Sequence, residues 1–207
     1  MNVFENGLQR YYSPQQLQKI QTKRIGIGGA GGLGSNVAVI LTRSGFKHFE
    51  ILDHDKIDAS NLNRQHFFVD EIGVPKITAL TKRLQGINPD VQITAHAHLW
   101  QAEFGEKFFC DCDFIFEAFD QAKSKHDFIT FYQRRCPWII SGNGMAGLTQ
   151  KQPMKIKKVG NVFFVGDLTT DVAQGHPPLA PRVTACAAMM AEVALDLTLG
   201  IPPAVSG

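Results

Sequence analysis

Four glycines stand in the segment GAGGLG at positions 29–34: Gly29, Gly31, Gly32 and Gly34. They match the pattern G-x-G-x-x-G, in which the missing side chains let the backbone turn tightly and approach a phosphate. The free N–H groups at the start of the helix expected next would point their positive end at this anion. Asp53 follows 19 residues after Gly34, where a carboxylate can accept hydrogen bonds from ribose hydroxyls. These residues predict a nucleotide site without distinguishing NAD, FAD, SAM or ATP.

A second group of polar residues lies beyond Asp53: Asn61, Arg64, Gln65 and Lys76. Arginine forks onto phosphate oxygens and lysine supplies a point charge, so both would stabilise the charge that develops as pyrophosphate leaves. Asn61 and Gln65 can hydrogen-bond a phosphate or a ribose without adding charge. Taken singly, the two cations are more often solvated surface charges. Beside the glycine segment, they favour a triphosphate over a dehydrogenase cofactor.

The elements that must position these residues alternate between short apolar strands and helical segments. This alternation predicts an α/β fold with a Rossmann-like, mostly parallel sheet and helices on both faces. The expected parallel strands are residues 24–28, 47–52, 91–95, 113–116 and 138–141, and the expected helices are residues 8–22, 33–42, 75–84, 123–134 and 183–199.

The last third of the sequence departs from this alternation. Gly160-Asn161 is a two-residue hairpin signal between the expected strands 154–159 and 162–165, so we expect an antiparallel pair that extends the sheet. Residues 167–181 contain three prolines and no clear period, which predicts a long loop that crosses the structure.

Length and composition limit the class of protein. The 207 residues fit a single domain spanning 1–207, and 44% hydrophobic residues are enough for a core. A formal net charge of +2 does not indicate a nucleic-acid or membrane partner. The N-terminal residues show no signal-peptide pattern, and no apolar run reaches the roughly 20 residues that span a bilayer. We therefore expect a cytoplasmic protein.

Four blocks of the sequence resemble the ThiF/MoeB superfamily, which includes the nucleotide-binding domain of ubiquitin-activating enzymes. They are GAGGLGS, the D-x-D that starts at Asp53, SNLNRQ, and IGVPK, which ends at Lys76. The resemblance runs from about Arg10 to Leu199. The length and the SGNG and APRV segments are most similar to the short, second family of thiamine-biosynthesis ThiF proteins.

The resemblance implies an adenylyltransferase that uses ATP and Mg²⁺ and releases pyrophosphate. Its substrate would be the C-terminal carboxylate of a ubiquitin-like, ThiS-like sulfur-carrier protein that ends in Gly-Gly. The glycine loop would hold the nucleotide and Asp53 would bind its ribose. Asn61, Arg64, Gln65 and Lys76 would surround the phosphates. Asp120, which follows the strand at 113–116, would hold Mg²⁺, although alone it would be assigned as a helix N-cap. The catalytic residues would be Arg64, Lys76 and Asp120.

Three departures from the superfamily pattern bear on function. The two C-x-x-C pairs that bind zinc in larger relatives are missing, so we predict no zinc. The loop at 166–181 has no cysteine, which predicts adenylylation alone, with sulfur supplied by a separate donor. The four cysteines are expected to be core residues: Cys110, Cys112, Cys136 and Cys186. Arg10 matches the first arginine of an R-Y-x-R motif whose second arginine reaches the partner subunit's nucleotide, but that second arginine is missing. A homodimer remains the expectation.

Several alternatives stay open. One is a member of the superfamily that adenylylates a small-molecule or tRNA-linked carboxylate, although a basic patch for tRNA is not obvious. Another is an NAD-dependent oxidoreductase, which would leave Arg64, Lys76 and Asp120 without a role. A third is a binding module without catalysis. Finally, Phe163 and Phe164 in the expected hairpin are either a docking face for the carrier or part of the core.

Overall fold

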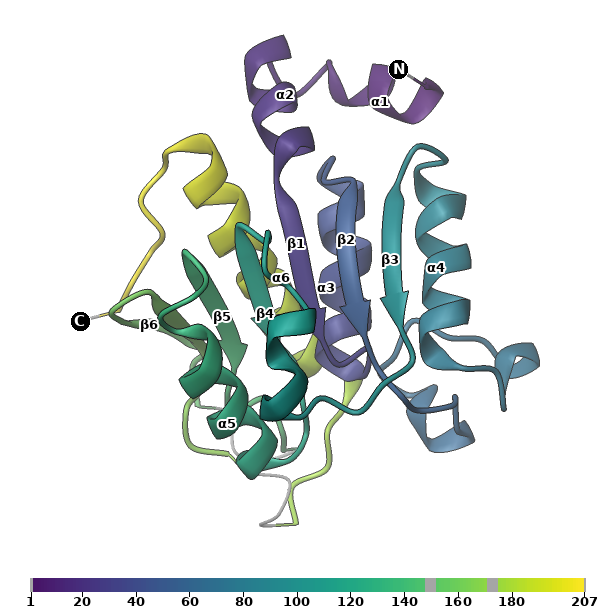
Figure 1. The fold of residues 1–207 in the computed structure, drawn as a ribbon, viewed down its shortest axis with the longest axis vertical. Coiled ribbons are helices and arrows are strands. Elements are labelled where there is room, and N and C mark those ends of the chain that lie inside the picture. The colour runs from purple at the N-terminus through teal and green to yellow at the C-terminus, as the bar shows by residue number, and fades with distance from the viewer. Residues whose placement is uncertain (1, 148–151, 171–174, 207) are drawn as a thin grey trace.

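A seven-stranded sheet forms the centre of the computed structural model, which describes residues 2–147, 152–170 and 175–206 (Figure 1). The strand order is β3-β2-β1-β4-β5-β7-β6, and every neighbouring pair is parallel except β6 with β7. The strands are β1 (Arg24–Gly28), β2 (His48–Leu52), β3 (Gln92–His96), β4 (Phe114–Glu117), β5 (Trp138–Gly142), β6 (Lys155–Val159) and β7 (Val162–Gly166). The expected mostly parallel sheet with an antiparallel hairpin is confirmed.

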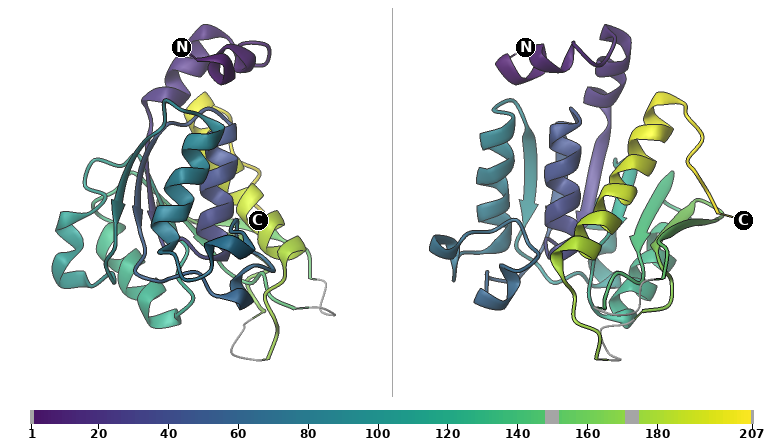
Figure 2. Two further views of the ribbon diagram at one scale, coloured as in Figure 1. Left: turned by 90° about the vertical axis from the view of Figure 1, so that its right-hand side faces the viewer. Right: turned by 180° about the vertical axis from the view of Figure 1, so that it is seen from behind.

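Helices cover both faces of the sheet (Figure 2). The α-helices are α1 (Val3–Leu8), α2 (Pro14–Thr22), α3 (Gly32–Arg43), α4 (Lys76–Ile87), α5 (Ala122–Tyr132) and α6 (Ala180–Leu199). Three short 3₁₀ helices are η1 (Ala59–Asn61), η2 (Val69–Glu71) and η3 (Ala102–Lys107). Helices α3, α4 and α6 lie on one face, whereas α5 and η3 lie on the other.

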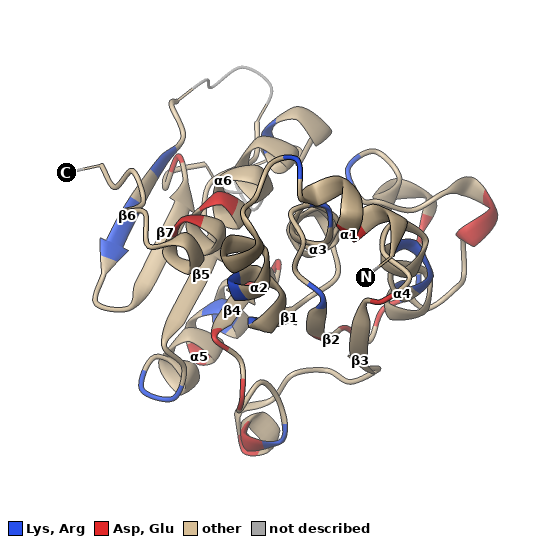
Figure 3. Cartoon of the chain, turned by 90° about the horizontal axis from the view of Figure 1, so that it is seen from above, with Lys and Arg blue, Asp and Glu red and all other residues tan. Residues whose placement is uncertain are grey.

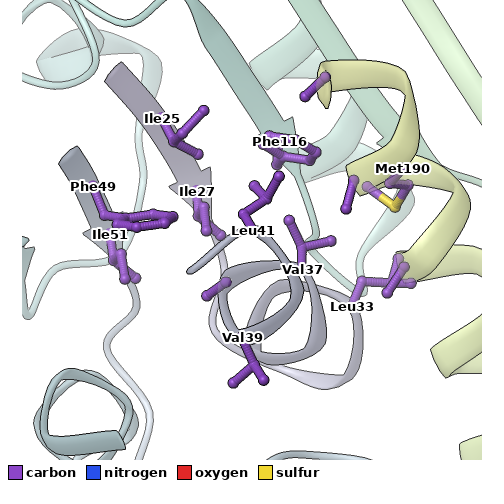
Figure 4. Packing of buried hydrophobic residues seen from close by; sticks show 14 of the residues in the cluster. Ile25, Ile27, Leu33, Val37, Val39, Leu41, Phe49, Ile51, Phe116 and Met190 are labelled. Atoms are coloured by element: carbon purple, nitrogen blue, oxygen red, sulfur yellow. The ribbon is translucent and has the colours of Figure 1, made fainter. Parts of the chain in front are cut away.

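The main core surrounds α3, which lies between the sheet and α6 (Figure 4). Val37 and Leu41, spaced four residues apart, are completely buried on the side of α3 that meets Ile25 and Ile27 of β1. Burying one such side chain contributes about 1.5–3 kcal/mol. This packing fixes the start of α3 against the end of β1, where the glycine segment lies.

The edge of the sheet beyond β7 is basic. Lys155, Lys157 and Lys158 on β6 are exposed (Figure 3), while Ile156 between them is buried. The C-terminal tail returns to this strand, because the Ser206 N–H donates a hydrogen bond to the Ile156 carbonyl at 2.8 Å. The outer side of β6 is therefore partly occupied by the chain itself.

The structure corrects several expected boundaries. Residues 8–22 are not one helix: α1 ends at Leu8, and α2 begins after Ser13, whose side chain and Gln16 form a capping box. Helix α6 begins at Ala180, three residues before the expected start. The loop after β2 contains η1, and η2 and η3 add two further turns. No helix in the described residues is both long and apolar enough to cross a membrane.

Candidate active site

Three predicted site residues, Gly29, Asp53 and Asp120, follow the carboxyl ends of β1, β2 and β4, which lie at one edge of the sheet (Figure 1). The connection from β1 leads to β2 on one side, and β4 pairs with β1 on the other, so the strand order reverses at β1. In open α/β sheets a crevice forms at such a reversal, outside the strand ends. The glycine loop follows β1 and Asp120 follows β4, which places both at this crevice.

The glycine loop is shaped by close backbone contacts. Gly29 has φ +96°, a region that favours glycine. A Cβ on Gly34 would lie 1.8 Å from the Gly29 carbonyl oxygen, so only glycine fits there. Gly31 is the N-cap of α3 and has no side chain to cap the helix. The first N–H groups of α3 are therefore available to an anion.

Asp53 is buried at the end of β2 and holds two backbone segments together. Its Oδ2 accepts a hydrogen bond from the Ala30 N–H at 2.6 Å, and its Oδ1 accepts one from the Asp55 N–H at 2.7 Å. Each carboxylate oxygen can accept a further bond. Asp53 thus fixes the glycine loop and keeps acceptor capacity for a ribose hydroxyl.

The segment 60–65 packs against the start of α3. The buried Asn36 amide on α3 donates to the Gly32 carbonyl at 2.6 Å and to the Arg64 carbonyl at 2.9 Å. Asp58 is the N-cap of η1, and Asn61 completes its capping box, since the Asn61 side-chain oxygen accepts from the Asp58 N–H at 3.1 Å. These bonds bring the segment to the edge of the glycine loop.

Arg64 and Gln65 lie beside different glycines of the loop. A Cβ on Gly32 would lie 3.5 Å from the Arg64 Cγ, and one on Gly31 would lie 3.8 Å from the Gln65 Nε2. The Arg64 guanidinium is held by the Ser60 carbonyl at 3.0 Å and the Asn63 side chain at 2.7 Å. Burial lowers the pKa of Arg64, and the negative charge of Asp120 opposes this shift. The negative charge of Asp120 therefore lies on the side of the site where Arg64 is found.

Lys76 begins α4 with a side chain that is only 7% exposed. Its Nζ lies 2.7 Å from the Asp55 Oδ2, and the Lys76 N–H donates to the Asp55 carbonyl at 3.0 Å. Since Asp55 also donates its N–H to Asp53, the lysine is connected to the predicted ribose-binding acid. Ligand atoms of Asp53, His54 and Asp55 lie within 4.8 Å of one another, and the ammonium of Lys76 balances part of this negative charge.

Asp120 is exposed in the short loop between β4 and α5. It is not the N-cap of α5, which is Gln121 without a side-chain cap bond. Within the described residues, the Asp120 carboxylate forms no hydrogen bond or ion pair, which leaves both oxygens available to a cation. This oxygen donor suits Mg²⁺.

The crossing loop between β7 and α6 lies over the segment 60–65. The Asn63 side chain donates to the Pro178 carbonyl at 3.1 Å. At its start, the buried Asp167 carboxylate pairs with Arg182 of α6 and accepts bonds from Thr169 and Thr170. Burial alone would raise the pKa of Asp167, but the bonds from Thr170 and Thr169 outweigh it and lower the pKa. Residues 171–174, a part of the expected loop at 167–181, lie outside the described residues.

The cysteines differ in position. Cys112, Cys136 and Cys186 are buried, as expected, whereas Cys110 is exposed, so the expectation of a core residue is wrong there. Burial raises the pKa of Cys186 to about 12 and that of Cys136 to about 11. These two thiols are therefore protonated near neutral pH.

The hairpin offers a smaller apolar face than the sequence suggests. Phe163 is 1% exposed and belongs to the core on the α6 side, so it cannot form a docking face. Phe164 is half-buried and packs against the aromatic cluster on the other face. The two rings point in opposite directions because side chains alternate along a strand.

Arg10 lies far from the nucleotide loop of its own chain. It stands between α1 and α2, at the amino end of β1, whereas the glycine loop is at the carboxyl end (Figure 1). Any contact of Arg10 with phosphates would therefore be made with the nucleotide of another copy.

The sequence reasoning missed two features of this region. Asn36 stands in an otherwise apolar stretch of α3, where a buried amide needs partners. The ion pair between Glu117 and Lys125 has its partners eight residues apart across a strand-to-helix turn, a spacing with no sequence signature. A charged residue inside the apolar run FIFEAF was the available signal.

The chemistry of the donors fits a nucleotide. Gln65 Oε1 is buried and has no hydrogen-bond partner among the described residues, and a ribose hydroxyl can supply the missing donor. The helix N-terminus, Arg64 and Lys76 supply positive charge for phosphates. Fold and site together define an α/β protein with a Rossmann-like sheet and with donors and charges that suit a nucleotide at its strand ends.

The sequence profile of the ThiF family matches residues 5–207, so the chain belongs to the ThiF family. It is 39% identical over 90 residues to ubiquitin-like modifier-activating enzyme 5 of Drosophila ananassae, covering 44% of this chain and 23% of that protein. It is 39% identical over 109 residues to SUMO-activating enzyme subunit 2 of Dictyostelium discoideum, covering 52% of this chain and 16% of that protein. The matched region is thus less than a quarter of these curated relatives.

Solved structures show the same fold. The TM-score with E. coli tRNA N6-threonylcarbamoyladenosine dehydratase, TcdA, in complex with ATP is 0.82 at 22% identity, covering 94% of this chain and 93% of that chain. E. coli MccB with ATP gives a TM-score of 0.69 at 20% identity, covering 92% of this chain and 60% of that chain.

Proposed function

We propose that this chain is an adenylyltransferase that activates the C-terminal carboxylate of a ubiquitin-like, ThiS-like sulfur-carrier protein, in thiamine biosynthesis. The observation that carries the proposal is the convergence of three features at one strand reversal. They are an anion-binding glycine loop, the cations Arg64 and Lys76, and the Asp120 carboxylate, which has no hydrogen-bond partner within the described residues. The named activities of the curated relatives, which activate ubiquitin-like modifiers and SUMO, support the same substrate class.

The reaction needs no nucleophile from the protein. A carboxylate oxygen of the carrier attacks the α-phosphorus of ATP, the bond from that phosphorus to the bridging oxygen breaks, and pyrophosphate leaves with the electron pair. Asp53 and Gln65 orient the ribose, and Arg64 and Lys76 stabilise the charge of the departing phosphates. Mg²⁺ held by Asp120 would neutralise phosphate charge when bound.

The ion pair between Lys76 and Asp55 suits this reaction. An ammonium that is 7% exposed needs a partner, and the half-exposed Asp55 supplies one at 2.7 Å. A triphosphate offers a second anion for the same ammonium. Asp55 thereby holds the Lys76 side chain in place before the nucleotide binds.

The carrier's tail would enter beneath the crossing loop. The bonds of Asn63 with Pro178 and of Asp167 with Arg182 place that loop over the segment 60–65. The buried, protonated thiol of Cys186 offers no nucleophile to the adenylate. Sulfur would therefore come from a separate donor.

A homodimer is part of the proposal. Arg10 is exposed at the amino end of the sheet and can reach a glycine loop only in a second copy. A two-fold arrangement would place each Arg10 at the other copy's crevice.

Pyrophosphate–ATP exchange with Mg²⁺ tests the proposal, using a sulfur-carrier protein that ends in Gly-Gly and the same protein without these two residues. We expect exchange only with the intact tail and a loss of about 10²-fold or more in Asp120→Ala. Asp127→Ala is the matched control, because this carboxylate pairs with Lys123 on the outer side of the neighbouring helix α5. Exchange with tRNA-linked or peptide carboxylates but with no carrier would overturn the carrier assignment. ATP binding without any exchange would indicate a binding module, and binding of NAD instead of ATP an oxidoreductase.

A further inference from the structure

A buried ion pair lies directly behind the Asp120 loop. Glu117, the last residue of β4, is completely buried, and its carboxylate lies 2.9 Å from the Lys125 Nζ. The same carboxylate accepts bonds from the Phe119 N–H at 2.8 Å and from the Ser141 hydroxyl at 2.6 Å. Lys125 also donates to the Gly142 carbonyl at 3.0 Å. The pair thus connects the ends of β4 and β5 to the first turn of α5.

This ion pair closes the loop that carries Asp120. The loop leaves β4 at Glu117 and enters α5 at Ala122, and Lys125 is one turn into the helix. The Asp120 side chain has no hydrogen bond within the described residues, and α5 lacks a side-chain cap. The position of Asp120 therefore depends on how the two ends of its loop are held.

The same loop packs against the glycine loop. A Cβ on Gly29 would lie 2.9 Å from the Ala118 carbonyl oxygen, and one on Gly28 would lie 3.0 Å from the Phe119 ring. Ala118 and Phe119 are the two residues between Glu117 and Asp120. A shift in this loop would thus change the distance between Asp120 and the phosphates bound at the start of α3.

We infer that Lys125, through its ion pair with Glu117, is the positioning residue for Asp120 and so sets how tightly the site binds the metal-bound triphosphate. The inference rests on the proposed function. The proposed function assigns the ribose to Asp53 and Gln65, which come from other elements, so the ion pair is expected to act mainly on the phosphate end of the nucleotide. Removing the pair is therefore expected to reduce the gain in ATP affinity on adding Mg²⁺ and to leave the affinity for AMP unchanged.

The test uses a variant that removes both charges, Glu117→Gln with Lys125→Met, because Lys125→Met alone would leave a buried carboxylate unpaired. The control is Asp113→Asn with Lys23→Met, which removes the ion pair at the opposite ends of β1 and β4. Four quantities are measured: the unfolding midpoint, the affinity for AMP, the gain in ATP affinity on adding Mg²⁺, and pyrophosphate exchange with the carrier.

In the double variant we expect an unchanged affinity for AMP, a lost Mg²⁺-dependent gain, and exchange slowed about 10–100-fold, since small misplacements at a reacting centre have effects of this size. The single variant Lys125→Arg, which keeps the positive charge beside Glu117, should retain most of the wild-type exchange. In an Asp120→Ala background, the double variant should add nothing, because both changes act through one carboxylate. The control pair should behave as wild type in all nucleotide measurements.

Two results would overturn the inference: a wild-type Mg²⁺ gain in the double variant, or an effect that multiplies fully with that of Asp120→Ala. If the double variant does not fold, Ser141→Ala is measured instead, because this change removes one hydrogen bond to Glu117 and no charge. A smaller loss of the Mg²⁺ gain would then support the inference, and an unchanged gain would overturn it. The Mg²⁺ gain is measured without a carrier, so a wrong carrier assignment, seen as no exchange in wild type, is distinguishable from a wrong role for Lys125.

Discussion

Replacing Gly34 by alanine tests whether the glycine loop is shaped by close packing. A Cβ at this position would lie 1.8 Å from the Gly29 carbonyl oxygen, 2.9 Å from the Gly29 carbonyl carbon and 3.1 Å from the Ile27 Cγ2. An ordinary contact needs roughly 3.3 Å or more, so the helix start and the loop would have to separate by about 1.5 Å. Neither can move freely, because Ile27 and the first turns of α3 are buried.

We expect this overpacking to lower the free energy of unfolding by about 3 kcal/mol. For a protein of this size, that corresponds to a fall in the melting temperature of about 6–12 °C. Nucleotide affinity should fall as well, since the N–H groups at the start of α3 would move with the loop.

Gly31→Ala is the matched control, measured by thermal unfolding and by ATP-binding calorimetry. The nearest atom to its Cβ would be the Gln65 Nε2 at 3.8 Å, an ordinary contact. We expect a nearly unchanged melting temperature but weaker ATP binding, because the methyl group would face the approaching phosphate. A melting temperature of Gly34→Ala equal to that of wild type would refute the packing argument. Equal losses of stability in both variants would show that the two positions do not differ as the structure indicates.

Three further predictions concern other parts of the site. Asp53→Asn should lower the free energy of unfolding by about 1–3 kcal/mol, because an amide NH₂ would face one of the two backbone N–H donors, and calorimetry should show weaker AMP binding; an unchanged unfolding free energy would contradict this. Because the folded-state pKa of Asp167 is lowered, its stabilising contribution is present above the unfolded-state pKa of about 3.9 and is lost as the pH falls through the folded-state value. Urea unfolding of Asp167→Asn should therefore depend less on pH below about 4 than wild type, and parallel pH curves would exclude this role. Iodoacetamide at pH 8 should add one label to the native protein, at the exposed Cys110, as read by mass spectrometry, and labelling of the buried cysteines would contradict their burial.

The sequence predicts best the central strands, which are buried because helices cover both faces of the sheet. The strand at Arg24–Gly28 has the expected bounds because a short apolar run followed by a glycine-rich turn has few other interpretations. The parallel order of the central strands follows from the alternation with helices. By contrast, α1 and η3 have six residues each, and the buried residue of α1 is the charged Glu5, so neither has a hydrophobic period.

Within the site, residue types and spacing locate the loop and the acids but not their partners. The glycine pattern, Asp53 and Asp120 each follow a strand, and strand ends meet at one edge of a parallel sheet. The pairing of Lys76 with Asp55 depends instead on where α4 begins relative to β2, which no local pattern specifies.

One local error and one open alternative have physical explanations. Cys110 and Cys112 stand two residues apart, but they lie in a turn: Phe109, just before Cys110, has φ +60°, and the Cys112 N–H donates to the Phe109 carbonyl at 3.2 Å, so only Cys112 enters the core. For Phe163 and Phe164 the sequence left a docking face and the core as alternatives, and because side chains alternate along a strand, the two adjacent rings lie on opposite faces.

The tail that returns to β6 has a consequence for self-assembly. An outermost strand presents unpaired N–H and carbonyl groups along its free side, where a strand from another molecule can add and begin a growing fibre. Here the Ser206 N–H occupies the Ile156 carbonyl, and the lysines on either side of Ile156 carry like charges that repel a second copy of the same strand. The chain thereby protects this edge in two ways, by occupying one of its carbonyl groups and by electrostatic repulsion.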